Sequence, residues 1–190
     1  MIGKPYDVGL ICGRFQTFHI GHESLVDEAL KLCDRVLLLI GSSQECGTER
    51  NPLNIITREK MLKMVYGDNP NIMIYGLADL TNENDISPDW GKYLLDNADR
   101  YIYKVPEIMI SGDDEERREW FAPEDILDMK QLIMNRGRIP ISATMVRQMM
   151  VENNRREWMR WVNPRLHKMY DEIRSELMNV SYYQKKAGVI

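Results

Sequence analysis

The fold is decided by residues 8–40, which read VGLICGRFQTFHIGHESLVDEALKLCDRVLLLI. The apolar run Val8–Cys12 is short enough for a buried strand, and residues 23–33 then place apolar side chains at helical spacing. Arg35–Ile40 shows no polar alternation before Gly41, as a parallel strand covered on both faces requires. The stretch therefore predicts a strand, a loop, a helix and a second strand, which form a right-handed βαβ unit.

The same alternation continues along most of the chain. We expect three further strands, at Asn71–Tyr75, Glu107–Ser111 and Lys130–Met134. Helices are expected from Thr57, from Ser87–Pro88, from Ser142 through Met150, at Arg156–Val162 and at Pro164–Met178. A loop is expected at 81–85, and the charge run at 113–119 is interpreted as a solvated helix start. This order predicts an α/β fold, a doubly wound, Rossmann-like parallel sheet of about five strands with helices on both faces. We expect residues 1–150 to form this domain and residues 151–190 to be a helical C-terminal extension packed on it.

Composition limits the class of protein. The chain has 190 residues, 25 Lys+Arg against 29 Asp+Glu, a net charge of −4 and 44% hydrophobic residues, which is typical of a single globular domain that folds without a disulfide or metal. Its mild acidity disfavours a nucleic-acid or membrane-surface partner, so an anion site has to be local. Three cysteines without a CxxC pair, and an apolar N-terminal run too short for a membrane span, favour a cytoplasmic protein.

The turn between the first strand and the first helix, Gly13–His22, carries the densest group of reactive side chains. Open α/β sheets bind ligands at such turns. Gly21 lacks the Cβ that would keep a phosphate from the backbone, and free N–H groups around His22 favour anions. His19 and His22 are three residues apart, so both imidazoles can face one phosphate chain, and Arg14 adds a positive fork. The turn therefore indicates a phosphate site.

A second candidate phosphate-binding stretch is Ile141–Arg147, ISATMVR. Ser142 and Thr144 offer hydroxyl and backbone N–H groups at a helix N-terminus, and Arg147 supplies charge. Taken alone, simple helix capping explains the two hydroxyl residues equally well.

Both stretches resemble one family. His19-Ile20-Gly21-His22 is the motif of the nucleotidyltransferase and class I aminoacyl-tRNA synthetase superfamily, and the preceding Gly13-Arg14-Phe15-Gln16 resembles the archaeal-type nicotinamide-nucleotide (NMN) adenylyltransferases and their bacterial relatives. Ile141–Arg147 is similar to the signature with which this family grips the ATP phosphates.

The resemblance extends through the middle of the chain. The loop beginning Gly41-Ser42-Ser43-Gln44 is similar to the Gly-Ser-Ala-Gln loop of the family, although Cys46-Gly47 stands where the family often has Ser-His. Asp79 and Trp90 lie where the family has an aspartate loop and a tryptophan that stacks on the nicotinamide ring. A plain core role for Trp90 is an equally good interpretation.

The resemblance implies adenylyl transfer from ATP to NMN, giving NAD and pyrophosphate without a covalent enzyme intermediate. It implies Mg²⁺ held mainly through the ATP phosphates, with no metal ligand assigned to the chain, and we expect a homo-oligomer. The implied catalytic residues are His19, His22, Arg14 and Arg147. The implied ATP-binding residues are Gly13, Arg14, Phe15, His19, Gly21, His22, Gly112, Ile141, Ser142, Thr144 and Arg147. The implied NMN-binding residues are Ser42, Thr48, Asn51, Asp79 and Trp90.

Two alternatives stay open at this point. One is a sister enzyme acting on phosphopantetheine, flavin mononucleotide or a cytidylyl acceptor, although such relatives usually carry Gly-Thr-Phe-Asp at the position of Gly13–Gln16. The other is a non-catalytic nucleotide-sensing module, against which the intact His19, His22 and Arg147 argue. The sequence does not choose between the amide and acid mononucleotides. It also does not choose whether the tail at 182–190 packs on the domain or mediates self-association.

Overall fold

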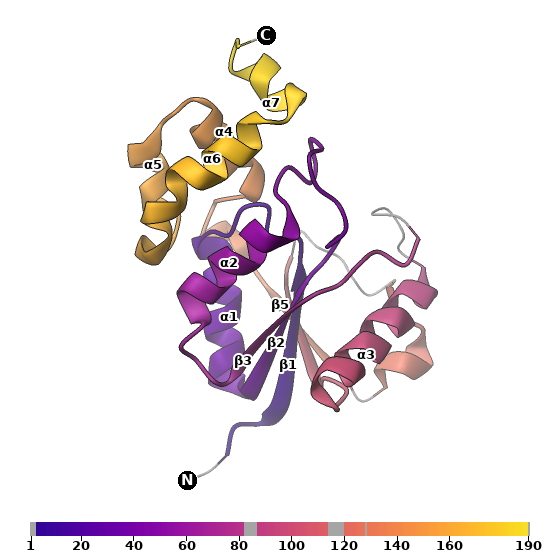
Figure 1. The fold of residues 1–190 in the computed structure, drawn as a ribbon. Coiled ribbons are helices and arrows are strands. Elements are labelled where there is room, and N and C mark those ends of the chain that lie inside the picture. The colour runs from indigo at the N-terminus through magenta and orange to yellow at the C-terminus, as the bar shows by residue number, and fades with distance from the viewer. Residues whose placement is uncertain (1–2, 82–86, 114–119, 128, 190) are drawn as a thin grey trace.

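The computed structural model describes residues 3–81, 87–113, 120–127 and 129–189. Its centre is an all-parallel sheet with the strand order β3-β2-β1-β4-β5 (Figure 1). The strands are β1 (Tyr6–Gly13), β2 (Cys33–Ile40), β3 (Ile72–Gly76), β4 (Ile108–Gly112) and β5 (Lys130–Met134). In this doubly wound order the direction of winding reverses between β1 and β4, which opens a crevice at the carboxyl ends of the strands. The predicted class and strand number are confirmed.

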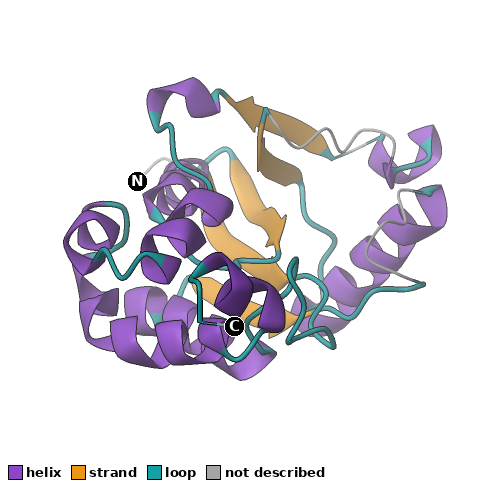
Figure 2. Ribbon diagram, turned by 90° about the horizontal axis from the view of Figure 1, so that it is seen from above, coloured by secondary structure: helices purple, strands orange, loops and turns teal. Residues whose placement is uncertain are grey.

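Helices cover both faces of the sheet (Figures 1 and 2). They are α1 (Ile20–Leu32), α2 (Ile55–Tyr66), α3 (Pro88–Ile102), α4 (Ala143–Val151), α5 (Arg155–Arg160), α6 (Tyr170–Met178) and α7 (Ser181–Lys186), with 3₁₀ turns at Pro123–Ile126, Arg136–Arg138 and Pro164–Met169. Side chains of the central strands alternate between two cores: Ile11 and Leu38 lie in the core with α1, α2 and the C-terminal helices, whereas Leu10 and Leu37 lie in the core with α3. The central strands β1, β2 and β4 are largely buried on both faces, so their buried residues are mostly apolar without alternation.

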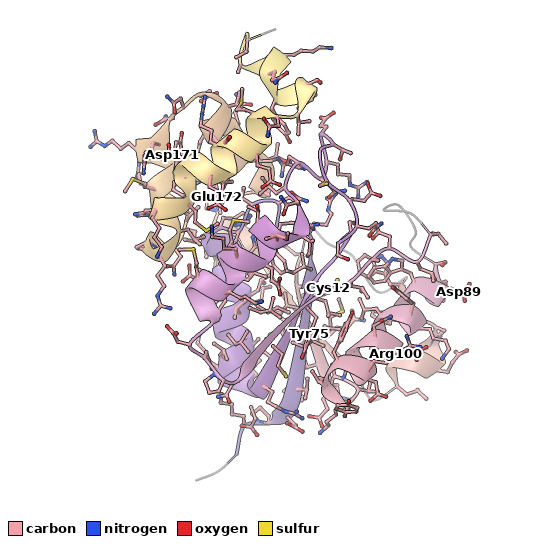
Figure 3. All side chains as sticks on the ribbon, in the orientation of Figure 1. Cys12, Tyr75, Asp89, Arg100, Asp171 and Glu172 are labelled. Atoms are coloured by element: carbon pink, nitrogen blue, oxygen red, sulfur yellow. The ribbon has the colours of Figure 1, made fainter. Side chains whose placement is uncertain are left out.

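The C-terminal helices lie at the end of the molecule toward which the strands point (Figure 1), and α7 lies over the end of the sheet when viewed from above (Figure 2). Trp158, Ile173 and Leu177 are buried in the same core as α1 and α2. Glu172 of α6, labelled in Figure 3, pairs with Lys60 of α2 at 2.6 Å. The segment after α4 is therefore packed on the domain.

Several predicted boundaries are wrong. Thr57 does not cap α2, because the side chain of Asn54 accepts the Thr57 N–H at 2.9 Å and the helix starts at Ile55. The helix expected through Cys33 ends at Leu32, and β2 begins at Cys33 without a loop. The single helix expected at 164–178 is a 3₁₀ turn followed by α6.

Two other expectations fall partly outside the described residues, namely the loop at 81–85, of which 82–85 are not described, and the charge run at 113–119, of which 114–119 are not described. Within the described ranges, none of the helices has the length and apolar character that crossing a bilayer requires.

At the opposite end of the sheet, Asp7 joins the three central strands. Its carboxylate accepts hydrogen bonds from Arg35 of β2 at 3.1 Å and from Lys104, just before β4, at 2.6 Å. The hydrogen bonds from Arg35 and then Lys104 lower the pKa of Asp7 from 3.8 to about 2. A lowered carboxyl pKa stabilises the fold above the unfolded value, and this contribution is lost as pH falls toward the folded value.

We therefore expect Asp7→Asn to lower the free energy of unfolding at pH 7 by about 1 kcal/mol or less, because the half-exposed cluster is screened by solvent. The difference in the free energy of unfolding between this variant and the parent chain should disappear between pH 4 and pH 2. Urea unfolding at pH 7 and pH 2.5 measures both values. Asp68→Asn is the matched control, since the Asp68 side chain is 94% exposed. A difference in the free energy of unfolding between Asp7→Asn and the parent chain that does not change with pH would contradict the lowered pKa of Asp7.

Candidate active site

A cavity of about 120 Å³ lies at the carboxyl end of β1 and brings together the two predicted phosphate-binding stretches. Its lining residues are Arg14, Phe15, Gln16, His19, His22, Arg50, Ser142, Ala143, Thr144 and Arg147. A second cavity of about 420 Å³ shares Arg14, Arg50, Thr144 and Arg147 with the first and is therefore its neighbour. The fold thus places residues more than a hundred positions apart in sequence around one cationic space.

The two histidines build the start of α1. The backbone N–H of Gly21 donates to His19 Nδ1 at 3.1 Å, and the backbone N–H of His19 donates to His22 Nδ1 at 3.3 Å. This reciprocal arrangement is a capping box made from two imidazoles. The rings stack with their centroids 3.8 Å apart, and His19 is fully buried. Both histidines are therefore held in one orientation by the helix that they start.

The same hydrogen bonds assign the imidazole tautomer. A ring nitrogen that accepts a backbone N–H cannot carry a proton, so in each neutral ring the proton is on Nε2. Both histidines line the cavity, and Nε2–H is the remaining donor of each ring; that of His19 is buried. Two neutral donors beside three arginines suit a site that binds a polyanion.

Gly21 packs closely against an imidazole ring, and its predicted role beside a phosphate stays a prediction. A Cβ at this position would lie 3.0 Å from Cε1 and Nδ1 of His19. The glycine therefore makes room for the His19 ring, whereas the sequence had suggested room for a phosphate. A larger residue at position 21 would have to displace this ring by a few tenths of an ångström.

The second stretch forms the N-terminus of α4. Ser142 caps this helix, as predicted, by accepting the Met145 N–H through Oγ at 3.2 Å. Arg147 donates to the backbone oxygen of Gln16 and, through Nη2, to Thr144 Oγ1 at 3.1 Å. Because Gln16 lies in the turn after β1, Arg147 joins the two stretches directly. Its Nε is buried and has no hydrogen-bond partner among the described residues.

Arg58 of α2 holds the loops around the site. It is fully buried, and its guanidinium donates to five backbone oxygens: Gly41 (2.8 Å), Ser42 (3.0 Å), Arg14 (3.2 Å), Glu45 (3.3 Å) and Asn54 (3.3 Å). Burial lowers the pKa of Arg58 to about 10, so it keeps its charge at neutral pH.

Three of these carbonyls, those of Arg14, Gly41 and Ser42, belong to or adjoin residues in the left-handed region, which are Phe15 (φ 51°) and Ser42 (φ 47°). Such conformations are uncommon for residues other than glycine and persist only where the surroundings enforce them.

The predicted NMN-binding residues fall into three places. Ser42 and Asp79 meet where β2 and β3 end: Ser42 Oγ donates to Asp79 Oδ1 at 3.0 Å, and Gln44 donates to Oδ2 at 3.0 Å. Thr48 and Asn51 form their own turn, in which Thr48 Oγ1 accepts the Asn51 N–H at 2.9 Å.

Trp90, the third case, lies on α3 in the core of the opposite face. It is 5% exposed, and its ring centroid is 4.7 Å from that of Trp120. In this structure Trp90 is thus a packed core residue.

Four predicted ATP-binding residues, Gly13, Gly21, Gly112 and Ile141, do not line the cavity around the histidines. Gly13 and Gly112 are the last residues of β1 and β4, and Ile141 is a core residue whose methyl group would lie 3.4 Å from a Cβ at Gly21. Conversely, sequence reasoning missed two residues. Arg50 lines both cavities, and an arginine in a polar loop carries no periodic signal. Arg58 falls on the buried stripe with Met61, Leu62 and Val65, and a charge on such a stripe is the signal that could have revealed it.

The model of the cytidylyltransferase-like family matches residues 10–156. The chain belongs to this family. The prediction of a nucleotidyltransferase is therefore confirmed at the level of the family.

Named relatives agree with the resemblance drawn from the sequence. A nicotinamide-nucleotide adenylyltransferase of Sulfurisphaera tokodaii is 25% identical over 168 residues, 86% of this chain and 90% of that protein. A protein of the same name from Saccharolobus solfataricus is 39% identical over 80 residues, but the match covers only 40% of this chain and 46% of that protein. The resemblance to the archaeal NMN adenylyltransferases is thus confirmed.

Solved structures share the fold. A bifunctional NMN adenylyltransferase/ADP ribose pyrophosphatase from Francisella tularensis, complexed with AMP and a manganese ion, superposes with a TM-score of 0.68 at 19% identity. The match covers 96% of this chain and 52% of that one, so this chain corresponds to about half of the bifunctional protein.

Arg58→Lys should test the role of the buried guanidinium. An ammonium has three donors and no planar fork, so at least two of the five carbonyls would lose their partner. We expect the free energy of unfolding to fall by about 2–4 kcal/mol and the affinity for ATP to fall with it. Denaturant unfolding and calorimetric ATP titration measure the two effects. Arg156→Lys, at an exposed position of α5, is the control and should change neither. An unchanged Arg58→Lys protein would show that the carbonyls are satisfied in another way.

Proposed function

We propose that this protein is a nicotinamide-nucleotide adenylyltransferase that joins ATP and NMN to form NAD and pyrophosphate. The observation that carries the proposal is the meeting of the His19–His22 capping box with Thr144 and Arg147 in one cationic cavity. It is supported by the named archaeal relatives, one of which aligns with 86% of the chain. Adenylyl transfer needs a site that holds a polyphosphate at one place and a second phosphate in line with it.

The chemistry requires no nucleophile from the protein. An oxygen of the NMN phosphate forms a bond to the α-phosphorus of ATP as the bond from that phosphorus to the bridging oxygen breaks, and pyrophosphate leaves with the electron pair. Charge builds up on the oxygens around the α-phosphorus and on the leaving group. We propose that the Nε2–H groups of His19 and His22 donate to these oxygens and that Arg14, Arg50 and Arg147 neutralise the chain of phosphates. Ser142 positions the α4 N-terminus, which adds backbone N–H groups.

Mg²⁺ belongs in this scheme as part of the ATP substrate. The described lining of the two cavities holds one carboxylate, Glu49, among several cations, and the described residues contain no group of three or more metal-binding side chains. Mg²⁺ prefers phosphate oxygens and water in such sites. We therefore propose that it enters bound to the ATP phosphates.

For the acceptor, we propose the polar region formed by Ser42, Asp79 and the turn at Thr48–Asn51. Ser42 and the Thr48–Asn51 turn lie on the loop after β2 that Arg58 holds, and Asp79, on the loop after β3, accepts a hydrogen bond from Ser42. A stacking role for Trp90 would require the ring to leave its contact with Trp120.

The proposal is tested by incubating the purified protein with ATP and Mg²⁺ and, in parallel, with NMN, its acid analogue, flavin mononucleotide and phosphopantetheine. We expect NAD and pyrophosphate from the first mixture on chromatography, and no product when EDTA replaces Mg²⁺. Product only from the flavin or pantetheine mixture would keep the mechanism but assign the protein to a sister activity. ATP binding without product in every mixture would overturn the enzymatic proposal in favour of nucleotide sensing.

Substitutions at His19 separate catalysis from helix capping. His19→Ala removes both the Nδ1 acceptor and the Nε2–H donor, whereas His19→Asn supplies a side-chain oxygen that can still cap α1. We expect both variants to lose at least about a hundredfold in turnover, as when one preorganised donor is removed from an anionic transition state. The Asn variant should be more stable than the Ala variant by about 1 kcal/mol. Turnover and urea unfolding measure the two effects, and recovery of turnover together with stability in the Asn variant would make His19 a purely structural residue.

A further inference from the structure

The larger of the two cavities is lined by the C-terminal helix as well as by the phosphate-binding stretches. Its residues are Arg14, Glu49, Arg50, Thr144, Arg147, Gln148, Tyr182, Tyr183 and Lys186. Four of these are cationic and one is a carboxylate, although the whole chain has a net charge of −4. Positive charge is therefore concentrated here, next to the cavity of the two histidines.

Helix α7 is fixed over this space by a specific contact. Tyr183 is 4% exposed, and its hydroxyl donates to the backbone oxygen of Glu49 at 2.6 Å. Glu49 precedes Arg50 in the loop between β2 and α2, which rises beside α7 in Figure 1. The contact thus holds one wall of the cavity, carrying Lys186, against another wall, carrying Arg50.

Lys186 lies on the last turn of α7, and its ammonium lies 5.4 Å from the centroid of the Tyr182 ring. Within the described residues the structure gives its ammonium no ion pair with a carboxylate. A lysine in this setting is a mobile point charge that can reach a phosphate oxygen without first breaking a salt bridge.

We propose that Lys186 of α7 is a further phosphate-binding residue, which contacts the terminal phosphates of ATP and the leaving pyrophosphate in the larger cavity. This inference rests on the proposed function, because Lys186 would bind the γ-phosphate end of the ATP whose α-phosphate reacts beside the histidines. The four residues shared by the two cavities make the path continuous: His19 and His22 face the α-phosphate end, and Lys186 faces the γ-phosphate end. The C-terminal helix is then a wall of the active site as well as a packing element.

The test compares Lys186→Gln with Lys185→Gln in the full chain. Both substitutions remove one positive charge from the exposed surface of α7, but Lys185 does not line either cavity. Calorimetric titration with tripolyphosphate and with pyrophosphate gives dissociation constants that need neither NMN nor turnover. We expect Lys186→Gln to weaken both by about fivefold to tenfold, as for the loss of one charge-assisted contact, and to raise the KM for ATP but not for NMN. Lys185→Gln should stay within about twofold of the parent chain.

The possible outcomes test the assignment of Lys186 and the adenylyltransferase proposal separately. Equal dissociation constants for Lys186→Gln and the parent chain overturn the assignment of Lys186, even if NAD is formed normally. Equal weakening in both variants also overturns it, because the effect is then general charge attraction. Selective weakening by Lys186→Gln in a protein that forms no NAD keeps the phosphate site and discards the adenylyltransferase.

Discussion

The buried guanidinium of Arg58 is the contact on which the candidate site depends. Two loops, after β1 and after β2, must turn sharply at the end of the sheet, and each does so with a residue in the left-handed region, Phe15 and Ser42. Neither residue is a glycine, so each turn costs about 1–3 kcal/mol that other contacts must offset. Arg58 donates to the carbonyls next to both turns and to two more in the same loop. One side chain therefore stabilises both loops at once.

This arrangement also has an electrostatic consequence. Arg58 is a charged group that is buried among carbonyl oxygens, which carry only partial negative charge, and no carboxylate hydrogen bonds to it among the described residues. Its positive charge is therefore only partly offset within the protein. A bound polyphosphate next to the loops would supply the missing negative charge. The residue that organises the loops thus also favours the ligand that we propose for them.

Prediction from sequence succeeded where a pattern was local. The apolar strands, the turn at Gly13–His22 and the cap at Ser142 follow from periodicity and from the chemistry of helix starts. Prediction was wrong where contacts between distant parts of the chain determine the local structure. Asn54 rather than Thr57 caps α2. The 3₁₀ turn at Pro164–Met169 interrupts an apolar stripe that is typical of one continuous helix. The resemblance to a family supplied candidate site residues but not their geometry. It did not indicate that Gly21 packs against the His19 ring or that α7 lines a cavity with Arg14, Thr144 and Arg147.

The C-terminal helices hold the N-terminal histidine motif in place. Two hydrogen bonds join the start of α1 to the segment just after α5: the N–H of Ile20 donates to the Trp161 backbone oxygen at 3.0 Å, and Glu23 accepts from Asn163 at 2.6 Å. Tyr183 then joins α7 to the loop of Arg50. The histidine motif is therefore oriented by residues about 140 positions later in the chain. Because the capping box fixes both imidazoles to the first turn of α1, any shift of that turn relative to α4 would move the histidines away from Arg147. Packing of the C-terminal helices is thus a condition for the geometry of the site.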